Sequence, residues 1–444
     1  MSRHDPRWRE RYAAQLGTPE EATGIVEDGD TVYAGIWTSV PTLLCAALAE
    51  RAGALRGVTV STGLTPFKWD RPEILEHYRI RTVYAGPHDR LGVRAGRIEY
   101  VPLAQWREGE LPPGFAANRL DVAMVPISPP DADGYCSFGG AVWLGPTVCR
   151  HARKLIGEVH PDFIRTGGEN AVHVSRFARL TECTTAPPPP PVAPRSEETE
   201  VAAQVICVLV ANEIVRDRCT LQIGIGDVSA ALALFLGERH DLGIHTELLP
   251  GGVTDLVKQG VVTGKYKAVH PGKVVAAAIA QVPREELDYI DGNPVFEFYD
   301  FTHTDDLRHL LRLENFVAVN NALAVDVTGN VASEGHGPAV FSGTGGQAAF
   351  AVAASTAAGG SVIVLPSSQL VGDERRSRIV VGHEPGTVVT VHRAFVDHVV
   401  TEQGIARLRG KSVRERIGEL VSVAHPDFRG ELRRDAARTY GIAV

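Results

Sequence analysis

The sequence contains no apolar run close to the roughly 20 residues that a membrane-spanning helix needs. Its beginning, MSRHDPRWRER, is polar, and no apolar segment follows the basic residues as one would in a secretory signal. These two features predict a cytoplasmic protein that does not use the membrane as a partner.

Cysteine is scarce, and its spacing fits neither a disulfide framework nor a metal site. The six cysteines form no CxxC pair, and most lie in apolar segments such as VICVLV around Cys207. This placement is typical of buried thiols in a reducing compartment. The 16 histidines form no HExxH motif, and Pro385 directly follows His383 and Glu384, which excludes a metal-binding helix there. We therefore predict no metal.

An excess of positive charge is also lacking. The chain has 45 Lys and Arg residues against 53 Asp and Glu residues, a net charge of −8. Nucleic-acid binding requires a basic surface that neutralises phosphates, so we exclude it as the main task. A length of 444 residues with 44% hydrophobic residues predicts an ordinary globular protein of two or three domains.

Proline is concentrated in one place, Ala186–Pro194, where five prolines stand together. Such a run is stiff and extended and donates few backbone hydrogen bonds, so it predicts a linker. We expect an N-terminal α/β domain at 1–185, a linker at 186–196 and a C-terminal α/β domain at 197–444. The segment 197–216 has the apolar pattern of a buried helix.

The two halves resemble each other in three pairs of segments that occur in the same order. DTVYAG at 30–35 matches TLQIG at 220–224, and VAMVPISPPDADG at 122–134 matches VAVNNALAVDVTG at 317–329 without gaps. KLIGEVHP at 154–161 matches GSVIVLP at 360–366. The pattern predicts an α/β fold of two similar domains, each with a mostly parallel sheet flanked by helices. Ligands of such sheets bind beyond the carboxyl ends of the strands, so we expect the active site in a cleft where the halves face each other.

The repeat is asymmetric at one position of chemical interest. The strand GIHTE of the second half ends in Glu247, whereas Ser61 or Thr62 is expected at the equivalent position of the first half. A carboxylate at the end of an apolar strand faces solvent, a partner or a substrate, because an unpaired buried charge is costly. Glu247 is therefore either a solvated turn residue or a catalytic group.

Two glycine-rich loops could hold an anion through their backbone N–H groups. Gly224-Ile225-Gly226 joins a strand to a helix start but lacks the third glycine of a dinucleotide site and a Walker lysine. The loop Gly343-Thr344-Gly345-Gly346-Gln347 precedes an Ala-rich segment, which predicts N–H groups presented at a helix N-terminus. A tight packing turn is the alternative for this second loop.

Several segments in order resemble the acetyl-CoA hydrolase/transferase family, which includes the 4-hydroxybutyrate and butyrate–acetate CoA-transferases. The resemblance covers nearly the whole chain. Its segments are SPPDADGYCSFG (128–139), LQIGIG (221–226), GIHTELLPGGVTDLVKQGVVT (243–263), NNALAVDVTGNVASE (320–334), SGTGGQ (342–347), VVTEQGIARLRGKSVRER (399–416) and AHPDFR (424–429).

The resemblance implies a CoA-transferase that moves CoA from an acyl-CoA to a small carboxylic acid through a glutamyl-CoA thioester on Glu247. It gives Gly343–Gln347 and Glu402 a role toward CoA or the oxyanion, with a structural cap as the alternative for Glu402. Gly224, Gly226 and Asn321 would form a wall of the acyl site, with Asn320 an alternative to Asn321. CoA esters are substrates, no permanently bound cofactor is implied, and a homodimer or higher homo-oligomer is expected.

The chain departs from the family pattern beside the expected site. Relatives often carry an acidic and a basic residue after GGQ, whereas this chain has Ala348, Ala349, Phe350 and Ala351 after Gln347. LLPGG follows Glu247 where a Ser-Asp-Gly is common. These changes leave the carboxylate in place but alter its surroundings, so other acids than the usual short-chain ones come into question.

Two alternatives to transfer follow from the same residues. In an acyl-CoA hydrolase, water would intercept the intermediate on Glu247. A CoA- or phosphosugar-binding module, or a sugar-phosphate isomerase on a related fold, would need no covalent intermediate, because a shared fold does not fix the chemistry.

Overall fold

The structure, a computed structural model, describes residues 4–103, 110, 119–184, 196–224, 226, 228–280 and 282–443. The predicted linker 186–196 lies outside the described residues except for Ser196. Contacts divide the chain into two compact units. The first comprises Met1–Pro191, Val275–Thr304 and Val340–Gly343, and the second comprises Val192–Val274, Asp305–Ala339 and Thr344–Val444. The predicted domain limits 1–185 and 197–444 stay a prediction.

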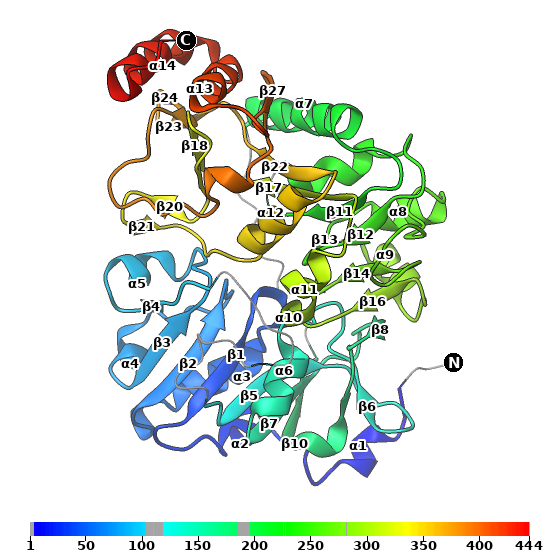
Figure 1. Cartoon of the computed structure of the whole chain (residues 1–444). Helices are drawn as coiled ribbons and strands as arrows, with labels where there is room; N and C mark the ends of the chain where they lie inside the picture. The colour runs from blue at the N-terminus through cyan, green and yellow to red at the C-terminus, as the bar shows by residue number, and fades with distance from the viewer. Residues whose placement is uncertain are drawn as a thin grey trace. The chain divides into compact units, whose positions relative to one another are not determined.

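The first unit contains a sheet whose described strands all pair in parallel, in the order β10-β7-β5-β1-β2-β3-β4 (Figure 1). Its central strands are buried on both faces, as β-branched and aliphatic runs predict. The strands are β1 Thr31–Ile36, β2 Val58–Gly63, β3 Tyr78–Thr82, β4 Glu99–Tyr100, β5 Val122–Ile127, β7 Lys154–Val159 and β10 Phe177–Glu182.

The second unit contains strands in the order β27-β26-β22-β17-β11-β12, all parallel except the β26–β27 pair. Buried apolar residues again fill the central strands. The strands are β11 Thr220–Ile223, β12 Gly243–His245, β17 Phe316–Asn321, β22 Gly360–Val364, β26 His398–Thr401 and β27 Gly404–Arg407.

The two sheets share a four-strand core. The order β7-β5-β1-β2 in the first unit matches β22-β17-β11-β12 in the second, and every pair within both sets is parallel. These are the strands that the sequence repeat paired, so the predicted α/β fold of two similar halves is confirmed.

Strand register locates the counterpart of Glu247. Val32 pairs with Val122 in one sheet and Leu221 pairs with Val317 in the other, so the repeat aligns Thr31 with Thr220. Their partners on the next strand are Thr59 and Gly243. Four residues further along, Gly63 corresponds to Glu247. The expected counterpart, Ser61 or Thr62, is therefore corrected by one or two residues, because register rather than loop length sets the equivalence.

Helices cover the sheets where the sequence has apolar helical patterns. The predicted helix at 197–216 forms as α7, with Ser196 as its N-cap. The helix start expected after Gly226 is the short 3₁₀ helix η5, Ser229–Phe235. The helices of the first unit are α1 Trp8–Arg11, α2 Pro19–Thr23, α3 Thr42–Glu50, α4 Pro72–Leu75, α5 Arg90–Arg94, α6 Gly145–His151, α9 Arg284–Ile290 and α10 Phe301–Thr304. Those of the second are α7 Glu197–Glu213, α8 Val253–Lys258, α11 Leu307–Leu310, α12 Gln347–Thr356, α13 Val413–Ser422 and α14 Pro426–Tyr440.

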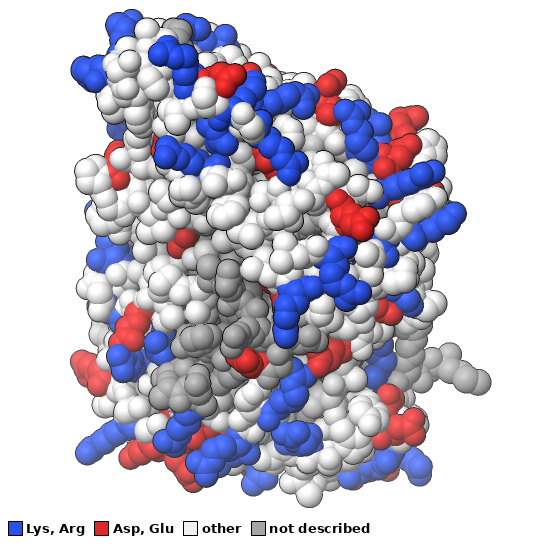
Figure 2. Space-filling model, viewed as in Figure 1, with Lys and Arg blue, Asp and Glu red and all other residues white. Residues whose placement is uncertain are grey.

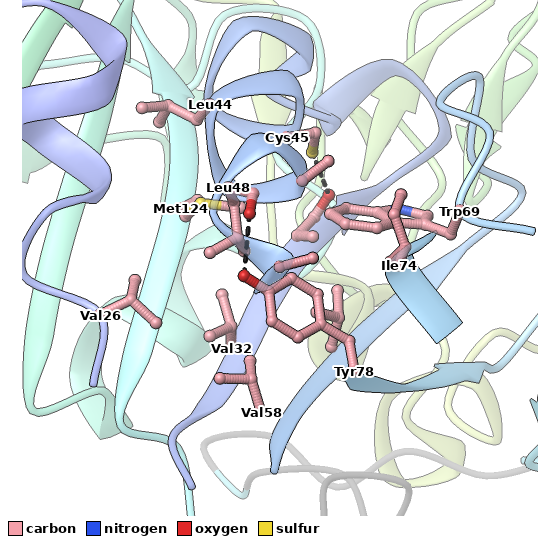
Figure 3. Packing of buried hydrophobic residues seen from close by; sticks show 14 of the residues in the cluster. Val26, Val32, Leu44, Cys45, Leu48, Val58, Trp69, Ile74, Tyr78 and Met124 are labelled. Carbon is pink, nitrogen blue, oxygen red and sulfur yellow. Dashed lines mark hydrogen bonds between the residues drawn. The ribbon is translucent and has the colours of Figure 1, made fainter. Parts of the chain in front are cut away.

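Each unit has its own apolar core. In the first unit, side chains of β1, β2, α3 and α4 surround Tyr78 and Trp69 (Figure 3). The Tyr78 hydroxyl donates a hydrogen bond to the Leu48 carbonyl at 2.9 Å, which satisfies the one polar group that this ring brings into the core. In the second unit, α12 packs on β17 and β22, and α13 packs on β27 and α14.

Among the described residues, no helix combines the length and the apolar character that crossing a bilayer requires. Basic and acidic side chains are interspersed over the face shown in Figure 2, in line with the mixed charge of the sequence. All six cysteines are buried and reduced.

Candidate active site

Glu247 stands directly after β12 and is held there by its neighbour Thr246. The buried Thr246 hydroxyl accepts a hydrogen bond from the Ile223 N–H at 3.2 Å and lies 3.1 Å from the carbonyl oxygens of Ile223 and Leu248. These contacts tie the end of β12 to the end of β11. The backbone on the N-terminal side of Glu247 is therefore anchored to the sheet.

The Glu247 carboxylate meets the N-terminus of α12. The N–H of Gly346, the residue before this helix, donates a hydrogen bond to the carboxylate. A helix N-terminus stabilises an anion through its free N–H groups and its dipole. The Gly346 N–H thus contacts a carboxylate of the chain itself, and the role of the loop Gly343–Gln347 toward CoA or an oxyanion stays a prediction.

The surroundings of this carboxylate are mostly apolar. Leu248 and Leu249 are buried, and the Phe350 ring packs beside Gly346. Burial raises the pKa of Glu247 to about 7, whereas the Gly346 N–H acts in the opposite direction. The residue as a whole is nevertheless partly exposed. A carboxyl group with this raised pKa is protonated more readily than that of an exposed glutamate.

A second carboxylate lies against the same glycine. A Cβ atom at Gly346 would be 2.8 Å from Glu247 Oε2 and 2.4 Å from Asp305 Oδ2. The two oxygens are therefore at most about 5 Å apart, the sum of these distances, which one bridging water can span. Asp305 is buried and precedes α11. Sequence patterns did not indicate Asp305, because it follows no strand of the repeat.

The residues of the loop before α12, Gly343–Gln347, contact different parts of the chain. Gly343 belongs to the first unit, where a Cβ would come within 2.6 Å of the Val83 carbonyl oxygen. Thr344 donates its hydroxyl hydrogen to Glu334 at 3.0 Å, and Gly345 has a left-handed backbone with φ of 56°. Gln347 donates from its side-chain amide to the Asn321 carbonyl at 3.2 Å.

Glu334 holds this loop by accepting the hydrogen bond from the Thr344 hydroxyl. It is buried, and its second oxygen accepts a hydrogen bond from the Thr390 hydroxyl at 3.1 Å. Glu334 stands at the end of a segment quoted for the family resemblance, but nothing in its spacing distinguished it from a surface acid.

The predicted acyl-site residues lie at the ends of β11 and β17. A Cβ on Gly224 would come 2.6 Å from Asn320 Oδ1, and one on Gly226 would come 2.4 Å from Asn321 Nδ2. Glycine is thus required at both positions by the neighbouring amides. Asn320 forms a reciprocal amide pair with the buried Gln222, at 2.8 and 3.2 Å, so its polar atoms are engaged in the sheet. Of the two asparagines, Asn321 is the one whose side-chain amide lies beside Gly226.

Glu402 forms hydrogen bonds with Ser367 and belongs to a different loop from Gly343–Gln347. It occupies the turn between β26 and β27 and accepts hydrogen bonds from the N–H and the hydroxyl of Ser367, the former at 2.9 Å. These contacts give Glu402 a structural task in joining two loops.

One group of potential metal ligands occurs among the described residues, in the first unit. Single ligand atoms of Glu158, His160 and Cys183 lie within 4.8 Å of one another, and all three residues are buried. Burial lowers the pKa of His160, but hydrogen bonds to Cys183 and Glu158 outweigh it and raise the pKa to about 9. Glu158 also accepts a hydrogen bond from the Leu44 N–H at 3.0 Å. A protonated imidazole paired with a carboxylate accounts for this group without a metal.

Two cavities are lined by other residues. One of about 380 Å³ in the first unit is mostly apolar, with Phe163, Ile164 and Ile279 in its wall. One of about 260 Å³ in the second unit is more polar, with Arg216 and His398. Their described lining residues do not include Glu247, so the chemistry of the carboxylate pair rather than cavity size identifies the candidate site.

Comparison with known proteins identifies the family of the chain. The acetyl-CoA hydrolase/transferase N-terminal domain model matches residues 1–182, and the C-terminal domain model matches residues 283–436. A 4-hydroxybutyrate coenzyme A transferase of Clostridium kluyveri is 32% identical over 98% of this chain and 100% of its own length. A succinyl-CoA:cyclohexane-1-carboxylate CoA transferase of Geobacter metallireducens is 32% identical over 97% of each chain.

Solved structures give the same result for the fold. The crystal structure of RipA from Yersinia pestis superposes with a TM-score of 0.86 at 28% identity, over 98% of this chain and 99% of that one. Full-length relatives, both domain models and the superposed structure thus agree on the family and the fold. The chain belongs to the acetyl-CoA hydrolase/transferase family.

Proposed function

We propose that this chain moves CoA from an acyl-CoA to a carboxylic acid through a thioester formed on Glu247. One observation carries the proposal: a carboxylate with a pKa near neutrality lies at a helix N-terminus, in contact with the Gly346 N–H. The chain is a CoA-transferase, as its family and its full-length relatives of that activity establish. CoA esters are accordingly its substrates.

The reaction begins with attack of the ionised Glu247 oxygen on the thioester carbonyl. The carbon–sulfur bond breaks, leaving an acyl–glutamyl anhydride and CoA thiolate. The thiolate attacks the glutamyl carbonyl, releasing the first acid and leaving glutamyl-CoA. The second acid reverses these steps and departs as its CoA ester. One exchange of thioesters is thereby divided into easier steps, with ping-pong kinetics.

The loop residues supply hydrogen bonds and space. We assign Gly343, Thr344, Gly345, Gly346 and Gln347 to the oxyanion and to CoA, because their N–H groups precede α12. Gly224, Gly226 and Asn321 are assigned to the acyl-site wall, where a larger side chain would collide with the β17 amides. Glu402 is assigned to CoA through the family resemblance, and Ser367 would fix its position.

Mixing the protein with acetyl-CoA and a panel of carboxylic acids tests the proposal. Mass spectrometry should detect new CoA esters that depend on the added acid, and Glu247→Gln should abolish them. The panel should include alicyclic and hydroxylated acids, because the surroundings of Glu247 differ from the family pattern. Retention of full transfer by Glu247→Gln would exclude the covalent route, and a wild type that turns over no CoA ester would favour a CoA-binding module.

We also propose a homodimer or higher homo-oligomer in the cytoplasm. Twofold assemblies are the commonest state of soluble enzymes, and six buried reduced thiols suit a reducing compartment. Analytical ultracentrifugation should give at least twice the 47.7 kDa chain mass. A monomer at micromolar concentration, or a secreted protein on cell fractionation, would contradict these two proposals.

A further inference from the structure

The first unit contains a cavity of about 380 Å³ at the carboxyl edge of its sheet. Thr38 in the cavity wall follows β1, and residues 162–164 in the same wall follow β7. Apolar side chains between the end of β15, Ala278–Ile279, and α9 form much of the rest of the described wall. The described lining residues include none of those assigned to CoA transfer, so this cavity calls for an explanation of its own.

The cavity lies where the strand order of the sheet reverses. The strands β2, β3 and β4 follow β1 on one side, whereas β5, β7 and β10 are added on its other side. Loops that leave the carboxyl ends of strands at such a reversal diverge, and the crevice between them is where open α/β sheets bind ligands. The loops after β1 and β7 both contribute to the cavity wall. The cavity therefore occupies the position at which a ligand of this sheet is expected.

Two tryptophans beside this cavity have strained backbones. Trp37 has a φ of 46° and Trp143 a φ of 42°, in the left-handed region that bulky residues rarely adopt. In the alignment of the two sheets, Trp37 takes the place of Gly226, whose φ is also positive. The duplicated loop has thus kept an unusual backbone although its glycine is replaced by a large side chain. Strain of this kind is concentrated at functional sites and ligand clamps, which favours a binding role for this loop.

The wall of the cavity is held in place by contacts behind it. Trp143 Nε1 donates a hydrogen bond to Thr38 Oγ1 at 2.9 Å, which fixes the Thr38 side chain. The Phe163 ring stacks on the His160 ring with 4.6 Å between centroids and 13° between planes. A Cβ atom on Gly139 would lie 2.6 Å from the Phe163 ring, so the backbone also packs closely against it. A ligand would therefore meet a preformed surface and would have little to order on binding.

The charge of the wall selects the class of ligand. Asp162 is the one charged residue among the described lining residues. Two arginines lie close by in the chain or in space, but Arg284 is paired with Asp288 at 2.7 Å, and Arg165 donates to the Pro129 carbonyl at 2.8 Å. Asp162 would repel a carboxylate ligand, whereas the hydroxyl of an alcohol or the ammonium group of an amine can donate a hydrogen bond to it.

We propose that this cavity binds a small apolar molecule whose head group donates hydrogen bonds, an alcohol or an amine. Its apolar part would lie against Phe163 and Ile279, and its head group would lie at Asp162. The volume is within the range of about 300–1,000 Å³ that is typical of small-molecule sites with a mostly apolar wall and few polar groups. The ligand thus differs in class from the acids that receive CoA.

The first experiment titrates the full-length protein at neutral pH with three probes that share one ring: cyclohexanol, cyclohexylamine and cyclohexanecarboxylate. Saturation-transfer NMR gives their dissociation constants. The alcohol and the amine should bind at least about 10-fold more tightly than the acid, the effect of a hydrogen bond to a charged group. Asp162→Asn should remove this preference. Binding of only the alcohol or only the amine would support the site and narrow the head group, whereas equal binding of all three probes in the cavity would overturn the proposal.

The second experiment fills the cavity with Ala280→Leu, because Ala280 lines it and is half-buried. The matched control Ala54→Leu adds the same group at an exposed residue of the same unit. Ala280→Leu should abolish binding of the alcohol and the amine, and Ala54→Leu should retain it, with thermal unfolding of both variants to verify their fold. Acid binding counts toward the cavity only where Ala280→Leu removes it, since the acid-substrate site also takes carboxylates. Alcohol and amine binding that persists in folded Ala280→Leu would overturn the proposal.

Discussion

At the scale of single residues, the site depends on how a glutamate is kept reactive in apolar surroundings. Burial removes solvent from the Glu247 carboxyl, which raises its pKa. The Gly346 N–H favours the ionised form. The balance yields a carboxylate that is a stronger base than an exposed glutamate and still ionises at neutral pH.

The pH dependence of transfer should report this balance. Attack requires the ionised form, so kcat/KM should fall as pH decreases through about 7, the pKa of Glu247. Steady-state kinetics from pH 5 to 9 measure this effect. A limb near the ordinary glutamate value in the wild type would contradict the described burial.

Gly346 should not tolerate even a methyl group. A Cβ would lie 2.4 Å from Asp305 Oδ2 and 2.8 Å from Glu247 Oε2, so Gly346→Ala must displace the Glu247 carboxyl group. We expect kcat/KM to fall about 100-fold, the cost of misplacing a reacting group by about 1 Å. Gly237→Ala is the matched control in the same unit, since an added methyl group there would have no atom within 4 Å beyond its chain neighbours. Equal activity of the two variants would be inconsistent with the geometry.

The buried His160 should titrate far above an ordinary histidine. Hydrogen bonds to Cys183 and Glu158 raise its pKa to about 9, despite the opposite effect of burial. Because the folded-state pKa exceeds the unfolded value of about 6.5, the stabilisation is complete below pH 6.5 and is lost as pH rises through 9. The stability advantage over His160→Gln should shrink by about 3 kcal/mol across this range. NMR titration of His160 near 6.5 would contradict the ion pair.

At the scale of elements, the duplication extends to a turn. In each half a strand is followed by an aspartate whose carbonyl accepts the N–H of a left-handed glycine three residues later, Asp131 with Gly134 and Asp326 with Gly329. Each aspartate side chain also accepts N–H groups two and four residues ahead. The same backbone geometry therefore explains why the repeat kept Asp and Gly at a constant spacing.

The two turns should differ in their contribution to stability. Asp326 is buried and additionally receives the Thr328 hydroxyl at 2.7 Å and the Asn330 amide at 2.8 Å, whereas Asp131 is half-exposed. Removing the Asp326 acceptor leaves buried donors unsatisfied, so Asp326→Ala should cost about 3 kcal/mol, against about 1 kcal/mol for Asp131→Ala. Chemical denaturation of both variants measures the difference. Equal losses would show that burial does not distinguish the turns.

The sequence predicted strands better than contacts between loops. Apolar runs and repeated turns placed β1, β5, β11 and β17, and the residue type at the end of GIHTE singled out Glu247. Asp305 could not be predicted, because it reaches Glu247 through the packing of a loop and a helix start rather than through a periodic pattern. Gly63 was missed as the counterpart of Glu247 because strand register is not visible in a single sequence.

At the scale of the whole molecule, the two compact units do not coincide with the two halves of the sequence. Residues 275–304 belong to the first unit, although in the sequence they lie between the repeat segments 220–224 and 317–329 of the second half. Sequence similarity identifies equivalent strands. Which unit a segment inserted between them joins depends on tertiary packing. Glu247, Asp305, Glu334 and residues 344–347 of the loop before α12 all belong to the second unit.

The most direct test of the account is to isolate the covalent intermediate. The protein is mixed with acetyl-CoA without an acceptor, quenched within one turnover and digested for mass spectrometry. The account predicts CoA linked to the peptide that contains Glu247, absent from Glu247→Gln and lost when a carboxylic acid is added before the quench. Rapid acid-dependent transfer with no adduct on this peptide, or with an adduct on another residue, would contradict it.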